Sequence, residues 1–486
     1  MDNAATPDDT DAGAQPGSAF AGSAQLYEVN RLIGGAAYLQ GHAYREKLIG
    51  SFRNNYNAVA PEYGLDIPLL LRICIKAKRD QAGFDLIFLL AIALFLASQF
   101  MVESALLTVF SLALAAVTNV LCGAHMRTKA RQFTKNNFDI AYIRDQYKEV
   151  TIPPDIAQAV PVPGQNLVVY RDFLPFIGAG YYDGGWSFDC ALEAPPGALL
   201  KKPVIPFSAA ELYAHLKQSL QALQVPDLEL TDRLFISGSA LKDDDRLFSD
   251  GYKRPVQIID DVLLQRCAGM DHVRMRHYLC IHVADWGGEL VTSYFVRVVL
   301  RAKSLYIEYS RLHLRPVAKN HRSVDRMPGA TPDNALAAVL IDIGTSPFVA
   351  LSALLHSGIG LFAILQRRLT PEWKQRKRLQ QIRSEASYNY GTAGSVRESL
   401  SGQQWQHFFQ RADDDRNRKL IERNLLDALA NFLDAHGADS EDLRERRTTI
   451  LNNGIVVNGG DVRAEALAVG KGARASKATA KTERPA

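Results

Sequence analysis

An apolar run from residue 86 to residue 121 constrains this chain more than any other feature. It contains no Lys, Arg, Asp, Gly or Pro, and its only charged residue is Glu103. Apolar runs of about 18 residues or more are typical of membrane-spanning helices. A single helix of about 36 residues would measure about 54 Å, whereas the hydrocarbon core of a bilayer is about 30 Å thick. The run therefore predicts two short helices joined near Glu103.

Basic residues on both sides of this run predict its orientation. They precede and follow it: Lys76, Lys78, Arg79, Arg127, Lys129, Arg131 and Lys135. Because positively charged flanks stay in the cytoplasm, both ends are expected there, which requires an even number of crossings. Residues 84–123 are therefore interpreted as an in–out–in hairpin of a bacterial inner-membrane protein, with most of the chain cytoplasmic. A buried helical hairpin in a soluble protein is the alternative.

The part before the hairpin is predicted to contain a tail and a helical region. Residues 1–20 are acidic, rich in Ala, Gly and Pro, and have no apolar segment, which predicts a disordered tail rather than a signal peptide. Residues 21–83 carry apolar side chains at spacings of three and four, which predicts helices. The net charge of +4 over 486 residues gives no reason to expect nucleic acid as a partner.

Residues 150–330 have a different pattern. Short β-prone runs at 167–170, 256–259, 277–283, 290–300 and 305–314 alternate with Gly and Pro turns. One amphipathic helix is expected at 211–223, because its Leu residues recur at helical spacing. This mixture predicts a cytoplasmic α+β domain.

A second apolar segment covers residues 335–366. It contains Asp342, a Gly-Thr-Ser-Pro break at 344–347, and basic residues at both ends. One crossing would place the basic C-terminal part outside, against the charge rule. The segment is therefore expected to be re-entrant or a helix pair, packed on the hairpin or buried in protein.

The stretch that follows is basic and contains a Trp, which suggests contact with a membrane surface. The residues concerned are Arg367, Arg368, Trp373, Lys374, Arg376, Lys377 and Arg378. Such a cluster favours anionic lipid head groups by about 1 kcal/mol per cation, and an ordinary solvated helix face is the alternative. Residues 370–453 are expected to be helical. Their helix at 417–436 has an apolar stripe that must pack on a neighbour or on a second copy.

A glycine-rich stretch at 176–188 is the most suggestive chemical motif. Its glycines are spaced GxGxxxG, not GxGxxG, and they lead toward a strand-like sequence instead of opening a helix. A similar glycine–aromatic turn recurs at 285–288. The candidate ligand loop consists of Gly178, Gly180, Gly184, Trp186 and Trp286. A purely structural turn is the alternative.

Catalytic and metal motifs are not recognisable in this sequence. It has neither GxSxG nor a P-loop, so no enzyme class is predicted and no cofactor is expected. His277, Cys280 and His282 are close in sequence, but on a strand His277 faces the side opposite to the other two. No metal site is therefore expected. The five cysteines form no CxxC pair, which argues against a zinc ribbon.

Two resemblances add to these patterns. The segments AAYLQGHAYREKLIG, PFIGAGYYDGGWSF and RHYLCIHVADWGGEL resemble an uncharacterised family of actinobacterial membrane proteins, which implies the architecture and no activity. The segment ILNNGIVVNGGDV at 450–462 is loosely similar to amyloid-like signalling motifs of bacterial proteins, which implies cross-β self-assembly. It precedes and overlaps a Gly/Val-rich segment and basic tail at 454–486. A small β-hairpin is the alternative.

The sequence thus predicts a membrane protein with an α-helical transmembrane hairpin, a cytoplasmic α+β domain and a helical C-terminal region. The leading functional hypothesis is a membrane-tethered interaction or signalling scaffold that self-associates through its C-terminal segment. Its expected partners are the lipid bilayer, anionic lipid head groups and a second copy of the chain. The alternative is a membrane-bound enzyme or small-ligand sensor that uses the Gly/Trp loops.

Overall fold

The structure is a computed structural model, and it describes most of the chain between Tyr27 and Arg447. The residues described are 27–53, 56–100, 104–194, 204–241, 245–248, 254–329, 331–369, 377, 379–380, 382, 384–385, 388–392, 394–445 and 447. Glu103, the tail predicted at 1–20 and the Gly/Val-rich segment at 454–486 lie outside these residues.

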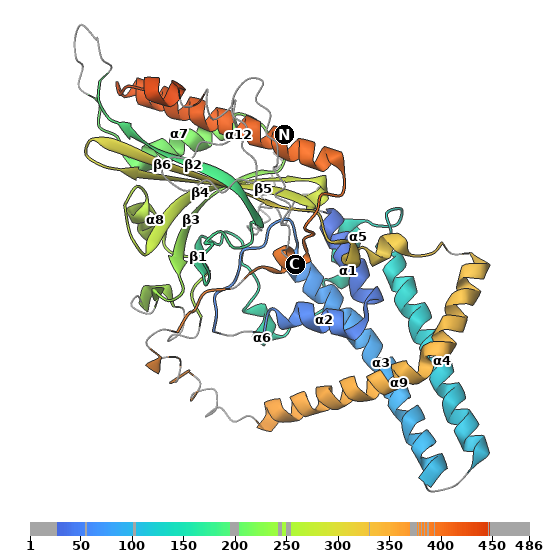
Figure 1. Cartoon of the computed structure of the whole chain (residues 1–486). Coiled ribbons are helices and arrows are strands. Elements are labelled where there is room, and N and C mark those ends of the chain that lie inside the picture. Colours follow the sequence, from blue (N-terminus) through green and yellow to red (C-terminus); the bar gives the residue numbers. More distant parts are fainter. Residues whose placement is uncertain are drawn as a thin grey trace, which may run out of the picture.

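The N-terminal helices pack into a base beside the sheet (Figure 1). The base consists of α1 (Tyr27–Leu39), α2 (Gly41–Gly50), the first part of α3 (Ile67–Phe100) and α5 (Ile140–Tyr147). Its core contains Leu32, Leu70, Ile73 and Phe133. Close packing needs glycine in α1, because a Cβ at Gly34 would lie 2.5 Å from the Phe133 ring. The predicted helical N-terminal region is thus present.

Helices α3 and α4 (Ala105–Arg131) form the predicted antiparallel hairpin. Its outer half exposes large apolar side chains, including Leu90, Phe100, Leu106 and Val109, which are 55% to 84% exposed. A third apolar helix accompanies the hairpin, however. Three helices are long and apolar enough to cross a membrane, the third being the first 24 residues of α9 (Pro332–Leu369). The expectation of only two such helices was therefore wrong.

Helix α9 continues through the break that was expected to divide it. Pro347 lacks the N–H that would bond to the carbonyl of Ile343. That carbonyl accepts a hydrogen bond of 2.8 Å from Ser346 Oγ instead. Helix α9 is one helix of 38 residues with Pro347 inside it, and it changes direction where it crosses α3 and α4 (Figure 1). The expectation of a separate helix pair at 335–366 was wrong.

The central domain contains one six-stranded mixed sheet, which confirms the predicted α+β class. Its strand order is β1-β3-β4-β5-β6-β2, and only β1 and β3 pair in parallel. The strands are β1 (Leu167–Tyr170), β2 (Tyr181–Ala191), β3 (Leu228–Ser237), β4 (Met275–Asp285), β5 (Leu290–Leu300) and β6 (Ser304–Leu314). The sequence did not predict β3. Residues 256–259 form no strand, because Ile259 N–H bonds to the Asn166 side chain.

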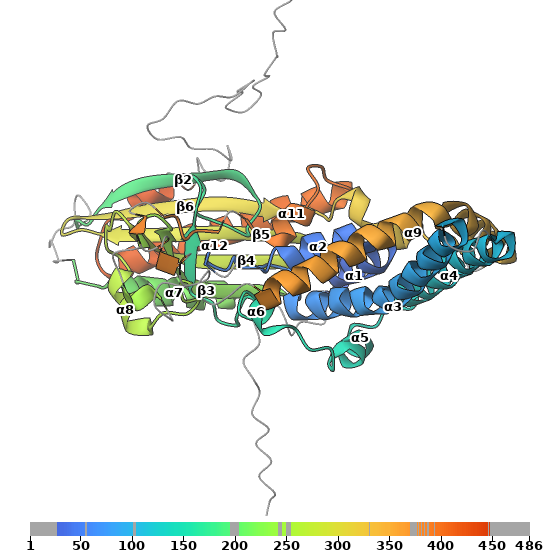
Figure 2. The ribbon, with the colours of Figure 1, turned by 90° about the horizontal axis from the view of Figure 1, so that it is seen from below.

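Two helices cover one face of this sheet, α7 (Ala209–Gln221) and α12 (Phe408–Ala435) (Figures 1 and 2). Leu216 of α7 and Leu425 of α12 share a buried core with Val296 and Ile307 of the sheet. The apolar stripe of the predicted C-terminal helix therefore packs on the sheet of its own chain. The opposite face packs on Phe176 and on Tyr63, which precedes α3.

Short elements connect these parts. They are α6 (Pro154–Ala157), α8 (Asp261–Cys267), α11 (Val396–Leu400), η2 (Asp245–Leu247), η3 (Trp286–Gly288), η4 (Lys319–His321) and η5 (Ser323–Arg326). Among them, α11 brings the C-terminal part of the chain against the helical base, and η3, between β4 and β5, contacts α1 of that base.

Candidate functional site

The glycine motif at 176–188 binds a carboxylate of its own chain. The backbone N–H groups of Gly178 and Gly180 donate to Glu398 Oε1 at 2.8 and 2.9 Å. Gly178 has φ +89°, and a Cβ there would lie 2.3 Å from the Pro61 carbonyl oxygen, so this position requires glycine. Burial raises the pKa of Glu398, and these two N–H groups moderate the shift. The loop thus holds a buried side chain of α11.

The remaining residues of the predicted ligand loop lie elsewhere, so the five do not form one site. Gly184 lies at the bulge in β2. Trp186 is buried between Phe188 and Tyr309 in the core beneath α7 and α12. Trp286 stacks on His407, and its Nε1 donates to Asp413 at 2.9 Å. The interpretation of these residues as a single ligand loop is therefore corrected.

Most of the predicted membrane-surface side chains lie outside the described part of the chain. Lys377 is described and exposed. Arg367 and Arg368 belong to the last turn of α9, and their side chains are not described. Four further residues of this stretch lie outside the described part of the chain: Trp373, Lys374, Arg376 and Arg378.

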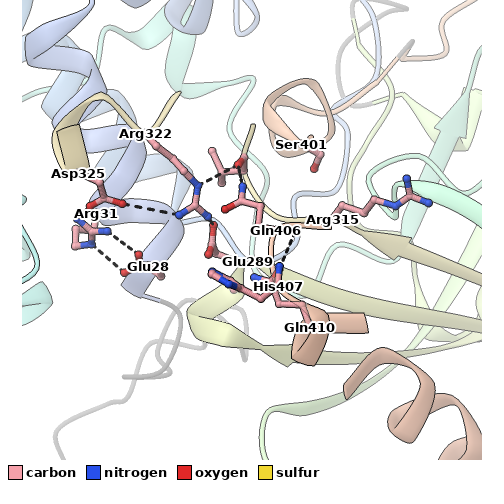
Figure 3. A network of polar contacts seen from close by, with 12 residues as sticks. Glu28, Arg31, Glu289, Arg315, Arg322, Asp325, Ser401, Gln406, His407 and Gln410 are labelled. Atoms are coloured by element: carbon pink, nitrogen blue, oxygen red, sulfur yellow. Dashed lines mark hydrogen bonds and ion pairs between the residues drawn. The ribbon is translucent and has the colours of Figure 1, made fainter. Parts of the chain in front are cut away.

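Arginine side chains join the helical base to the sheet domain, as Figure 3 shows. Arg31 of α1 forms ion pairs with Glu28 at 2.6 Å and Asp325 at 2.8 Å. Arg322, which links η4 and η5, pairs with Glu289 just before β5. A cavity of about 420 Å³ adjoins these residues and is also lined by Trp286 and His407. These contacts fix the segment that leads into α9 against the sheet.

Arg397 of α11 lies at the centre of this junction and is fully buried. Its Nη2 donates to the carbonyls of Gly288, Glu289 and Arg315 at 2.8 to 3.2 Å, and its Nη1 donates to Ser401. Burial lowers the pKa of Arg397 to about 10, so it remains charged at neutral pH. One guanidinium therefore connects the ends of β5 and β6 to α11.

Glu62 binds the same short helix from the other side. Its two carboxylate oxygens accept the backbone N–H groups of Val396 and Arg397 at 2.6 and 2.9 Å. Burial raises the pKa of Glu62 to about 8, although both N–H bonds act against the shift. Because Glu62 precedes α3, this contact ties the root of the hairpin to the C-terminal part of the chain.

Asp183, His313 and Asp414 bring three potential metal-ligand atoms within 4.8 Å of one another. His313 Nε2, however, accepts a hydrogen bond of 3.0 Å from Arg315, so Nδ1 carries the proton and faces the two carboxylates. Arg311 also pairs with Asp183. Burial acts to raise the pKa of Asp183, but His313 and Arg311 outweigh it, so that pKa is lowered. Two arginines and a protonated Nδ1 fit an internal ion network better than a metal site.

The histidines of β4 face opposite sides of the sheet, as the two-residue period predicts. His277 lies against Tyr213 of α7 and 3.3 Å from Asp232. His282 stacks on Tyr63 and hydrogen-bonds Ser293 on the other face. Sequence reasoning missed the three-residue cluster around His313, because its members come from β2, β6 and α12.

The fold and these junctions define a class of protein in which an α+β domain is joined rigidly to a long apolar helical hairpin. The chain belongs to the AbeC-like domain family, whose model matches residues 185–463, more than half of its length. The match begins within β2 and includes α9 and α12, whereas the hairpin α3–α4 lies before it. It supports the expected uncharacterised bacterial family, and it carries no information on an actinobacterial source or an amyloid-like motif. Comparisons with curated proteins and with solved structures give no match.

Proposed function

We propose that this protein is an integral membrane protein whose hairpin α3–α4 holds a cytoplasmic α+β domain at the bilayer as an interaction platform. The unbroken course of α3 supports this role. Residues near its start, such as Leu70 and Ile73, belong to the core of the helical base. Its last turns expose Leu96 and Phe100. Anchor and domain share one helix, so they would move as one body.

The strongest support for the topology is that the segments on both sides of α9 share one hydrophobic core. The sheet precedes α9 and α12 follows it, yet Ile307 and Leu425 belong to the same core. In the proposed topology, both segments would therefore lie on the same side of the membrane. A return crossing after Leu369 would need about 20 further apolar residues, whereas the sequence at 370–390 is rich in charged residues.

The contacts of α9 are consistent with a helix that enters the bilayer and leaves on the same side. Its Asp342 pairs with Arg127, near the cytoplasmic end of α4, at 2.6 Å. Farther along, Ala353 packs with Phe88 and Ala115, and Ala115 lies about 15 Å from the start of α4 at 1.5 Å per residue. Helix α9 would thus reach about halfway along the hairpin. The basic residues at its end would then return to the anionic head groups.

Extraction of membranes with alkaline carbonate tests the anchor. We expect the full chain to remain in the pellet. A variant with Leu96→Arg and Val109→Arg should move to the supernatant, because an arginine at mid-bilayer costs about 2.5–3.5 kcal/mol on insertion scales. Leu420→Arg, on the exposed side of α12, is the matched control and should stay in the pellet. Release of the full chain by carbonate would contradict the anchor.

Self-association through the C-terminal segment is the second part of the proposal, and it rests on the sequence of residues 450–462. The test compares chains ending at 449 and at 469 with the full chain, by native mass measurement in detergent. The chain ending at 469 loses only the basic tail and should keep its oligomers, whereas the chain ending at 449 should not. Equal oligomeric states of all three would refute this part and leave the anchor untouched.

A further inference from the structure

A second cavity, of about 630 Å³, lies between the start of α3 and the first half of β3. Strand β1 pairs only with the second half of β3, at residues 234–237, so the first half has an open edge. Glu229, Thr231 and Arg233 alternate along that half and line the cavity. Arg72 of α3 lines it as well.

Four buried polar atoms around this cavity lack a hydrogen-bond partner among the described residues. They are Arg72 Nε, Arg233 Nε, Thr231 Oγ1 and Gln165 Oε1. Arg233 and Gln165 are each only 6% exposed. Buried polar groups in folded proteins are usually paired, and these four atoms lie beside one cavity, so they are the candidate contacts of a polar ligand there.

The charges of the cavity favour an anion. At its rim, Arg144 pairs with Asp66, and Lys148 pairs with Asp145. Within the part of the chain that the structure describes, Arg72 and Arg233 have no carboxylate within ion-pair distance. Arg233 instead donates to the Tyr63 hydroxyl at 2.5 Å. Two guanidinium groups therefore remain beside two carboxylates, Glu229 and Glu62. Burial raises the pKa of both carboxyl groups, and Glu62 is already bound to the backbone N–H groups of α11. Guanidinium groups match carboxylate and phosphate oxygens in geometry and charge.

We propose that this cavity binds a small organic anion, whose carboxylate or phosphate group is held by Arg72, Arg233 and Thr231. The body of the ligand would lie against the apolar part of the wall, which includes Leu65, Pro68, Leu69, Pro161, Val162 and Pro163. The volume is within the range of small-molecule sites, roughly 300–1,000 Å³.

The ligand is a soluble molecule rather than a lipid head group. Leu69, in the wall of the cavity, precedes the start of the apolar run by about 17 residues, or about 25 Å of helix. A head group at the bilayer surface would not reach that far. The ligand would nevertheless contact α3, the helix that continues into the hairpin, so it would bind beside the cytoplasmic start of the proposed anchor.

Titration calorimetry on the full chain in detergent tests the site. The probes are inorganic phosphate, phenyl phosphate and benzoate, with benzyl alcohol as the uncharged control. We expect saturable binding of phenyl phosphate or benzoate, tighter than that of inorganic phosphate, and none of benzyl alcohol. The tighter of the two aromatic anions identifies the preferred head group. Absence of binding for all three anions at millimolar concentration would overturn the proposal.

Variants show whether the named residues hold the anion. Arg72→Gln should weaken binding by about tenfold or more, because it removes a charge-assisted hydrogen bond. Thr231→Val should weaken it several-fold and leave the thermal midpoint of the unliganded protein unchanged or higher, since Oγ1 has no partner there. Lys76→Gln, one turn farther along α3 and paired with Asp80, is the matched control and should change binding less than twofold. Equal effects of Arg72→Gln and Lys76→Gln would refute the site.

Discussion

Replacement of Arg397 should loosen the whole junction between the helical base and the sheet. Its guanidinium donates to three backbone carbonyls and to Ser401 in a fully buried position. Arg397→Met leaves those buried carbonyls without their donor but also removes the cost of burying the charge. Each buried acceptor left without its donor typically costs about 1–3 kcal/mol. Because three carbonyls lose their donor and the removed burial cost offsets part of the loss, we expect a net loss of about 3–5 kcal/mol. For a folding unit of about 250 residues, each kcal/mol of lost stability lowers the thermal midpoint by about 2 °C, so the midpoint should fall by about 6–10 °C.

The assay is thermal unfolding of the full chain in detergent, followed by tryptophan fluorescence, since Trp186 lies in the sheet core. Arg397→Lys keeps the charge without the planar fork of donors and should give an intermediate loss. Arg416→Met is the matched control, because the Arg416 side chain is 65% exposed and its ion-pair partner among the described residues is Asp413. That pair should contribute less than about 1 kcal/mol. Equal midpoints for Arg397→Met and Arg416→Met would refute the reasoning.

Three further predictions follow from single contacts. Because burial raises the pKa of Glu62 to about 8, above its unfolded value, its contribution to stability falls as pH rises from about 4.5 to 8, by up to about 1.4 kcal/mol per pH unit. Glu62→Gln should remove that part of the slope in thermal midpoints measured across this range, and an unchanged slope would contradict it. Gly178→Ala should destabilise the folded protein in the same unfolding assay. The strained backbone alone, with φ at +89°, should cost about 1–3 kcal/mol, and the clash of the new Cβ with the Pro61 carbonyl oxygen adds to this cost. A midpoint within about 1 °C of the original would argue against a strained glycine there. Ser346→Ala should increase protease cleavage within α9, because the Ile343 carbonyl loses its donor; Ser352→Ala, where no proline follows, is the control, and equal cleavage would refute this.

The hairpin and the α+β class could be predicted from the sequence because each depends on local patterns. The composition of the run at 86–121 is enough to predict a pair of apolar helices. Alternation of apolar and polar residues marks β6, and the Leu stripe marks α7. The packing partner of α12 was left open between a neighbour and a second copy. An apolar stripe indicates that one face of a helix packs against another element, but it does not identify that element.

The junction could not be predicted, because its partners are far apart in the chain. Gly178 and Glu398 are 220 residues apart, so the glycine spacing could not indicate that an internal carboxylate fills the loop. The continuity of α9 through Pro347 could not be predicted either, because the Gly-Thr-Ser-Pro sequence is typical of a break. The cavity beside Arg233 likewise combines α3, β3 and the residues before β1.

Cysteine accessibility in cells tests the central claim most directly. In a chain with Cys122→Ser, the other cysteines are buried. Single cysteines are then placed at Leu106, Asn334 and Phe408, which are all exposed. A membrane-impermeant maleimide should label the Leu106→Cys chain on intact spheroplasts, and the other two only after lysis. Labelling of Asn334→Cys and Phe408→Cys from opposite sides would contradict the shared side of α9 and the account built on it.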